Sequence, residues 1–229
     1  TRTIPKTLCI IMKNVTTILF ICIISQCFGQ YFSGTVQYET IVEINDSNQE
    51  YLSYYKGKYG NSHTIEIDKE GRIKKIFEGT KNPGFEYIII DPFDSISYSK
   101  FTFSDSIYAS NPKIELTALL KIDTLPSEKI LDRDCEVYKL TMLESSEYGN
   151  LFWYLTIWLD PKLKLKPNLY STWKEGHWNT ISSLENGLFL KSELTNGYLN
   201  VTFSAINVRK RKIKHIKTNP DNLFVKRID

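Results

Sequence analysis

The chain has few of the residues that build disulfides and metal sites. Among its 229 residues are four Cys and three His. Three of the Cys lie within residues 1–29, so Cys135 stands alone in the rest of the chain and no disulfide can form there. A lone Cys is most often a small buried apolar residue, and no His stands near Cys135 in sequence to activate it.

Catalytic and cofactor motifs are also absent from the sequence. It has no GxSxG, no phosphate-binding loop and no dinucleotide fingerprint. His63, His177 and His215 are not spaced with Cys, Asp or one another as zinc sites require. Asp132 and Asp134 are more typical of a turn than of a metal site. We therefore expect no metal, no cofactor and no enzyme, although triads can assemble from distant residues.

A strong excess of charge is missing as well. The net charge is +3, and Arg2, Lys6 and Lys13 in the first 29 residues account for all of it. Residues 30–229 are therefore close to neutral, whereas nucleic-acid binders usually keep a strong positive excess. We expect no nucleic-acid partner.

The N-terminal residues have the pattern of a secretory signal. The apolar run VTTILFICII follows a basic residue and precedes SQCFGQ. This run is too short to cross a bilayer, which takes about 20 residues. We expect Met12 to be the true start, cleavage after Gly29, and export of residues 30–229 to the periplasm, to the outer membrane or beyond it. The alternatives are an uncleaved anchor, a buried first element of the fold, and a lipid on Cys27.

Short alternating segments separated by turn residues fill the region from residue 32 to residue 103. In residues 32–44, Val36, Tyr38 and Val42 share one face, and Gln37 and the acids share the other, which predicts a half-buried strand. Similar patterns predict strands at 51–59, 63–68, 72–77, 85–90 and 95–103. Aromatic residues form 13% of the chain, which favours β structure. The pattern predicts a single mainly β domain with an antiparallel sheet.

Two segments further on differ from this pattern. Residues 112–122 carry Ile and Leu at near-helical spacing after a proline, so we expect a short helix there. Residues 128–143 predict a turn at Asp132–Asp134 followed by a strand from Cys135 to Leu143.

The most apolar run after the N-terminal segment is LFWYLTIWLDPKLKLKP, from Leu151 to Pro167. A strand with one wet face alternates apolar and polar residues, and this one does not, so we expect both of its faces to be covered. The cover is either the protein's own side chains or an apolar ligand. Because proline cannot donate to a ladder, the strand is expected to end at Asp160-Pro161.

The segment from Asn168 to Leu184 places two Trp and a His among polar residues. A long loop pinned by its aromatic residues and a binding lid both fit this composition. Residues 187–194 and 198–208 then predict a hairpin across Asn196-Gly197. The candidate ligand contacts of this region are Phe152, Trp153, Tyr154, Trp158, Trp173 and Trp178.

A basic run follows at residues 209–217. One interpretation is contact with an anionic membrane surface. The other is a solvated edge strand whose lysines prevent pairing with another chain. The residues that would make the membrane contact are Arg209, Lys210, Arg211, Lys212 and Lys214.

Four short motifs in a familiar order give the chain a resemblance. They are FSGTVQYE at 32–39, KILDRDCEVYKL at 129–140, LTIWLDPKLKLKP at 155–167 and GLFLKSE at 187–193. Together they resemble poorly characterised exported proteins of Gram-negative bacteria, which are similar to the outer-membrane lipoprotein carriers (LolA-like) and to the GLPGLI family. The chain departs from them in two ways. Asp132 stands where the turn before the Cys-bearing strand usually has Gly, and the chain has no GLPGLI sequence.

The resemblance implies a curved antiparallel half-barrel, partly closed by short helices, with an apolar concave face. In the carriers that face holds lipoprotein acyl chains. The first functional hypothesis is therefore an envelope protein that binds an acyl chain, a lipid or a lipoprotein. The second is a structural or interaction protein whose core is filled by its own side chains. An enzyme would require His177 to lie near a carboxylate in a cleft.

Overall fold

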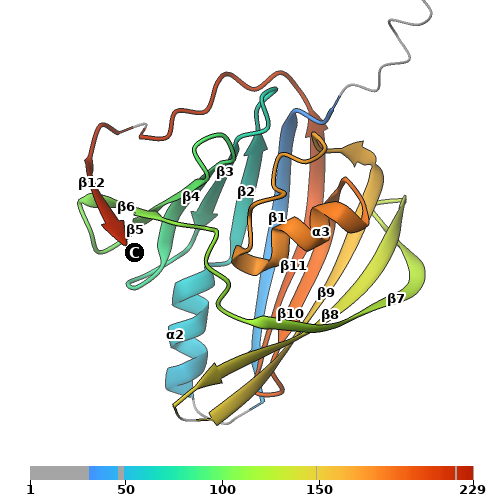
Figure 1. The fold of residues 1–229 in the computed structure, drawn as a ribbon. Coiled ribbons are helices and arrows are strands. Elements are labelled where there is room, and N and C mark those ends of the chain that lie inside the picture. Colours follow the sequence, from blue (N-terminus) through green and yellow to red (C-terminus); the bar gives the residue numbers. More distant parts are fainter. Residues whose placement is uncertain (1–30, 46–48, 148, 220, 229) are drawn as a thin grey trace, which may run out of the picture. The chain divides into compact units, whose positions relative to one another are not determined.

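A computed structural model describes residues 31–45, 49–147, 149–219 and 221–228, and the account below concerns the unit Phe32–Asp229. The expected signal sequence lies outside the described residues. The unit is one open, curved, mixed sheet of 12 strands with two short helices and one short 3-10 turn (Figure 1). Among the described helices, none is long and apolar enough to cross a bilayer.

The strands fall into two groups along the chain. The first group covers β1 (Gly34–Ile44), β2 (Ser62–Ile67), β3 (Ile73–Glu78), β4 (Phe85–Asp91), β5 (Ile96–Phe101) and β6 (Ser106–Ser110). The second covers β7 (Ala118–Ile130), β8 (Arg133–Ser146), β9 (Gly149–Lys164), β10 (Gly187–Thr195), β11 (Leu199–Lys210) and β12 (Phe224–Ile228). The helical elements are α2 (Gln49–Tyr59), η1 (Glu175–His177) and α3 (Trp178–Leu184).

The order across the sheet is β12-β6-β5-β4-β3-β2-β1-β11-β10-β9-β8-β7. Neighbours pair antiparallel except β12 with β6, which are parallel. The predicted mainly β fold with a curved half-barrel sheet is therefore confirmed, with one parallel pair added at an edge. The predicted hairpin across Asn196-Gly197 is also present, between β10 and β11.

The strand predicted at 51–59 is wrong, because these residues form α2. Four of its eleven residues are Tyr, which favours a strand by composition, but the apolar residues have helical spacing. Leu52, Tyr55 and Tyr59 recur on one side of the helix and pack on the core around Val42 and Val201. Glu50 in the first turn and two lysines in the last turn also complement the helix dipole.

The helix predicted at 112–122 is wrong as well. Residues from Ala118 onward form β7, which pairs with β8 along its length. The apolar residues that suggested a helical face are in fact largely exposed, with Leu116 at 76% and Leu120 at 53% of full exposure. Strand pairing therefore overrode the local spacing. Pro126 is tolerated because β7 is an edge strand with a register shift between Leu125 and Glu128.

Three boundaries also need correction. β9 does not end at Asp160-Pro161 but continues to Lys164, with an irregularity in its pairing to β10 that accommodates the proline. The turn between β7 and β8 lies at Leu131 and Asp132, both with positive φ, rather than at 132–134. The basic run is not an edge strand: Arg209 and Lys210 end β11, which is central in the sheet, and 211–217 are irregular.

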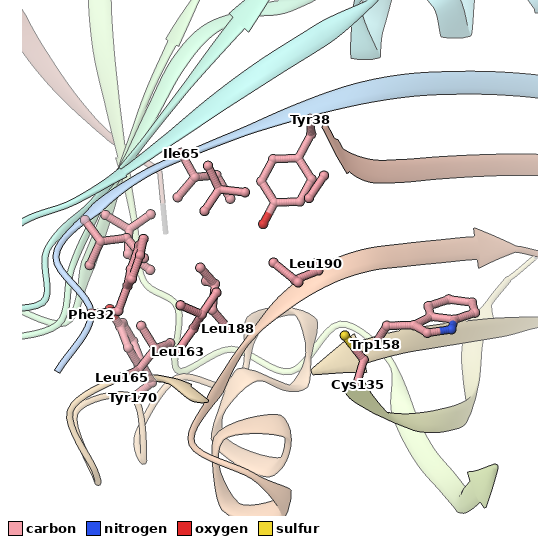
Figure 2. Packing of buried hydrophobic residues seen from close by; sticks show 14 of the residues in the cluster. Phe32, Tyr38, Ile65, Cys135, Trp158, Leu163, Leu165, Tyr170, Leu188 and Leu190 are labelled. Carbon is pink, nitrogen blue, oxygen red and sulfur yellow. The ribbon is translucent and has the colours of Figure 1, made fainter. Parts of the chain in front are cut away.

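One hydrogen bond spans the curve of the sheet. Tyr38 in β1 is fully buried, and its hydroxyl donates to the carbonyl oxygen of Phe189 in β10 at 2.6 Å. Strands β1 and β10 both flank β11, so the bond bridges two strands that are not neighbours. The Phe189 carbonyl lies beside a bulge, where the pairing with β9 skips Leu190. Figure 2 shows the Tyr38 hydroxyl directed toward the strand that carries Leu190.

His63 of β2 stacks on the Tyr38 ring, with centroids 4.6 Å apart and an interplanar angle of 5°. It is 1% exposed, and neither ring nitrogen has a hydrogen-bond partner. Desolvation, together with the positive charge of Lys75, lowers the pKa of His63. The folded protein therefore holds this ring neutral.

We predict that acid destabilises the protein through His63. The unfolded chain takes up a proton near pH 6.5 and the folded chain does not, so stability is lost as pH falls below about 6.5. In chemical denaturation, His63→Phe should reduce the loss of unfolding free energy between pH 7 and pH 5 by about 2 kcal/mol. A variant with the wild-type pH dependence would contradict this assignment.

Candidate functional site

The concave face of the sheet contains a cavity of about 300 Å³. Its floor is built by β2 to β5, whose inward residues follow the two-residue period of the strands. Leu188 and Phe189 of β10 close it from the far side, because the sheet curves. The residues that β2 to β5 contribute are Ile65, Ile73, Lys75, Phe85, Ile88, Ile90, Ser97 and Ser99.

Residues 168–184, here named the covering segment, roof the cavity with Trp173, Glu175, Gly176 and Trp178. Within this segment α3 crosses the sheet on one face (Figure 1). Trp178 contacts the Phe189 ring, with centroids 5.5 Å apart. The composition of the segment suggested either a pinned loop or a lid; it is a structured cover over an apolar space.

Several contacts hold the covering segment in place. Tyr170 is buried, and its hydroxyl donates to the carbonyl oxygen of Gly71 in the turn before β3. Its ring also packs against Trp173 and Trp178. The backbone N–H groups of Lys174 and Glu175 both donate to the carbonyl oxygen of Pro112, at 2.8 and 2.9 Å. These bonds tie the roof both to the turn before β3 and to the chain that leads into β7.

His177 is a further tie of the covering segment. Its Nε2 lies 2.9 Å from Thr117 Oγ1 and its Nδ1 lies 3.5 Å from Glu115 Oε1. The ring is buried, and desolvation lowers its pKa against the opposing effect of Glu115. The carboxylate neighbour that an enzyme would require is thus present, but His177 does not line the cavity under the covering segment.

Cys135 is buried, as expected for a lone Cys. Burial raises the pKa of its thiol to about 11, so the reactive thiolate is disfavoured.

The polar groups of the cavity are few. Ser97 and Ser99 lie on the floor, Lys75 projects from β3, and Glu175 of the covering segment is exposed. Burial lowers the pKa of Lys75 to about 8. Partial desolvation raises the pKa of Glu175, which weakens its negative charge. Apolar walls with a small number of placed polar groups are typical of small-molecule sites.

The six predicted ligand contacts separate into two groups. Trp173 and Trp178 line the cavity. The four from β9 do not: they are Phe152, Trp153, Tyr154 and Trp158. Strand β9 is separated from the floor strands by β10, β11 and β1, which the sequence could not reveal.

Each of the four β9 residues has other surroundings. Phe152 is 47% exposed and Tyr154 lies under the Lys139 ammonium, at 4.9 Å from its ring centroid. Trp153 donates to Glu144 at 2.7 Å. Trp158 is buried, donates to Glu128 at 2.9 Å and carries Lys191 over its ring. The expectation that both faces of this strand are covered holds for Ile157 to Leu159, whereas residues 151–156 are partly open.

The basic residues after β11 lie on the opposite, outer face. Ile213 and Ile216 are buried against Tyr87, Ile89 and Ile107. These two anchors leave the basic side chains outside, and all five predicted anion contacts are exposed: Arg209, Lys210, Arg211, Lys212 and Lys214. A hollow of about 410 Å³ lies between this segment and the outer side of β2 and β3.

Asp68, Glu70 and His215 place three potential metal-ligand atoms within 4.8 Å of one another. The guanidinium of Arg72 already occupies this neighbourhood, 3.2 Å from His215 Nδ1 and 3.9 Å from an Asp68 oxygen. Asp68 also accepts backbone hydrogen bonds, including one from Ile216 at 3.1 Å. The group is therefore an ion-pair network that fixes the basic segment.

Among the cavity residues that sequence reasoning missed, Lys75 is the one cation. The alternation of residues 72–77 places it on the same face as Ile73 and Phe77. A lysine on the apolar face of a predicted strand was the available signal.

Comparison with known proteins gives distant similarities. No family model and no curated protein matches the chain. A solved structure of PNGF-II is 14% identical, with a TM-score of 0.44, over 86% of this chain and 31% of that one, so the chain spans about a third of it. Lipoprotein LppX of Mycobacterium tuberculosis is 8% identical over 80% of this chain and 89% of its own, with a TM-score of 0.36. LprF of Mycobacterium bovis is 9% identical over 81% and 90%, with a TM-score of 0.28. Similarities this distant carry no information about ligand or activity.

Proposed function

We propose that this protein binds an apolar chain, such as an acyl chain or the lipid of a lipoprotein, in the cavity under the covering segment. The observation that carries the proposal is the cavity itself, a partly open space of about 300 Å³ lined mainly by Ile, Leu, Phe and Trp. Ligand sites are typically concave and mostly apolar. A space of this size and lining is therefore a candidate ligand site, at the lower end of the range for ligand pockets.

The second hypothesis, a structural or interaction protein filled by its own side chains, applies best to the other half of the sheet. There Leu140, Met142, Ile157, Leu159 and Ile181 form a closed cluster. The proposed binding is accordingly confined to the half built by β2 to β5. We further propose binding without catalysis, with His177 acting as a tie of the covering segment through Thr117.

The proposed place of work is the cell envelope. This rests on the secretory pattern of residues 12–29, which predicts export to the periplasm, to the outer membrane or beyond it.

We also propose that the basic residues at 209–217 contact an anionic membrane surface. All five candidate residues are exposed, and Ile213 and Ile216 hold the irregular segment 211–217 against the outer face of the sheet. The basic side chains of this segment are therefore held at a fixed position on the surface. Each basic residue near such a surface contributes about 1 kcal/mol.

One prediction concerns the cavity as an apolar binding site. Ile88→Phe adds volume to its floor and should lower uptake of the neutral apolar probe N-phenylnaphthylamine at least tenfold in a fluorescence titration. Ile41→Phe is the matched control, because Ile41 is exposed on the outer side of β1. Overpacking costs about 1–3 kcal/mol, so thermal unfolding should confirm that both variants fold. Equal uptake by both variants, or no uptake by the wild type, would refute the binding proposal.

The second prediction concerns the membrane. Lys212→Ser combined with Lys214→Ser should weaken sedimentation with phosphatidylglycerol-containing vesicles by about fivefold per residue. Lys121→Ser combined with Lys129→Ser is the control, since both lysines are exposed on β7, far along the sheet order from the basic segment. If both double variants bind equally well, the basic segment does not make the contact.

A further inference from the structure

The cavity contains a charged side chain that a purely apolar ligand does not need. Lys75 projects from β3 between Ile65 of β2 and Ile88 of β4, with which it is in register. Ser99 of β5 pairs with Ile88, so Lys75, Ile88 and Ser99 form one row across the floor. Ile73, Ile90 and Ser97 form the next row. The apolar floor thus carries a cation on β3 and two hydroxyl-bearing residues on β5, with isoleucines of β4 between them.

The ammonium of Lys75 has no anionic partner among the described residues. Its contacts are two aromatic faces, the Phe203 ring at 4.6 Å and the Phe77 ring at 5.0 Å. Among the described residues that line the cavity, Glu175 is the one acid; its side chain is exposed, and it forms no ion pair with Lys75. Burying an unpaired charge is costly, which is reflected in the lowered pKa of Lys75.

Lys100, which is more deeply buried than the half-buried Lys75, shows how this fold pairs an ammonium group. Lys100 in β5 forms an ion pair with Glu86 at 3.3 Å and donates to the carbonyl oxygens of Phe101 and Ser104. Its charge is fully compensated by the protein. Lys75 lies two strands away, and its ammonium contacts aromatic rings and no acid among the described residues. A ligand can therefore supply the negative charge that pairs with it.

We propose that Lys75 anchors the head group of the ligand, and that the ligand is a single-chain carboxylic acid. The carboxylate accepts hydrogen bonds from the Lys75 ammonium, and the alkyl chain lies on the isoleucines of the floor, under Trp173 and Trp178. The cavity volume of about 300 Å³ suits one short chain and not a two-chain lipid. This inference rests on the proposed function and adds the chemical class of the ligand.

The test compares decanoate with decanol, which differ in the head group alone. Isothermal titration calorimetry should give at least tenfold tighter binding of decanoate to the wild type, the usual effect of a hydrogen bond to a charged group. Lys75→Met should remove this preference, so that decanoate no longer binds more tightly than decanol. Lys74→Met is the control, because Lys74 is the neighbouring residue on the outer face, where its ammonium lies over the Tyr87 ring.

A second readout separates an anchoring role from a structural one. Since Lys75 is desolvated and unpaired, Lys75→Met should raise the melting temperature of the free protein, whereas loss of a structural residue would lower it. Tight decanoate binding by Lys75→Met, or equal binding of decanoate and decanol by the wild type, would overturn the head-group assignment and leave the apolar site standing. Binding of neither probe would overturn the proposed function as well.

Discussion

The hydrogen bond from Tyr38 to the carbonyl oxygen of Phe189 is the contact on which the concave face depends. It joins β1 to β10 across β11 and satisfies a carbonyl group beside the bulge at Leu190. The bulge lets Leu188 and Phe189 turn toward the floor formed by β2 to β5. Without this bond, the two parts of the curved sheet would lose a buried hydrogen bond that holds them together.

The curvature has different consequences in the two halves of the sheet. Around β8 and β9, large side chains meet one another and fill the interior. Above β2 to β5, the floor carries isoleucines and two small serines, while the roof is held in place by Tyr170 and by bonds to Pro112. The roof is therefore supported at its margins, away from the cavity, and the space beneath it stays open. The proposed ligand site therefore lies in this half of the sheet.

Much of the fold could be predicted from sequence, because alternation reports directly on which face of a strand is buried. Val36, Tyr38 and Val42 lie on the buried face as expected, and Asn196-Gly197 turns a hairpin. The errors at α2 and β7 have one cause: in both segments composition or spacing pointed one way, and packing against the rest of the sheet decided the other.

The site was less accessible to sequence reasoning. Trp173 and Trp178 were identified because aromatic residues in a polar segment are conspicuous. The aromatic residues of β9 were grouped with them on hydrophobicity, yet the strand order places β9 away from the cavity. A cavity depends on how a sheet curves, and no local pattern encodes curvature. Lys75 could have been predicted, since its position on an apolar face follows from alternation alone.

The central claim is that the cavity holds a ligand, and native mass spectrometry of the full chain purified from a cell-envelope fraction tests it most directly. The account predicts a mass above that of the chain, which falls to the chain mass on delipidation and returns when decanoate is added. A bare chain mass before delipidation, with no adduct after addition of decanoate, would contradict it and leave a sheet filled by its own side chains.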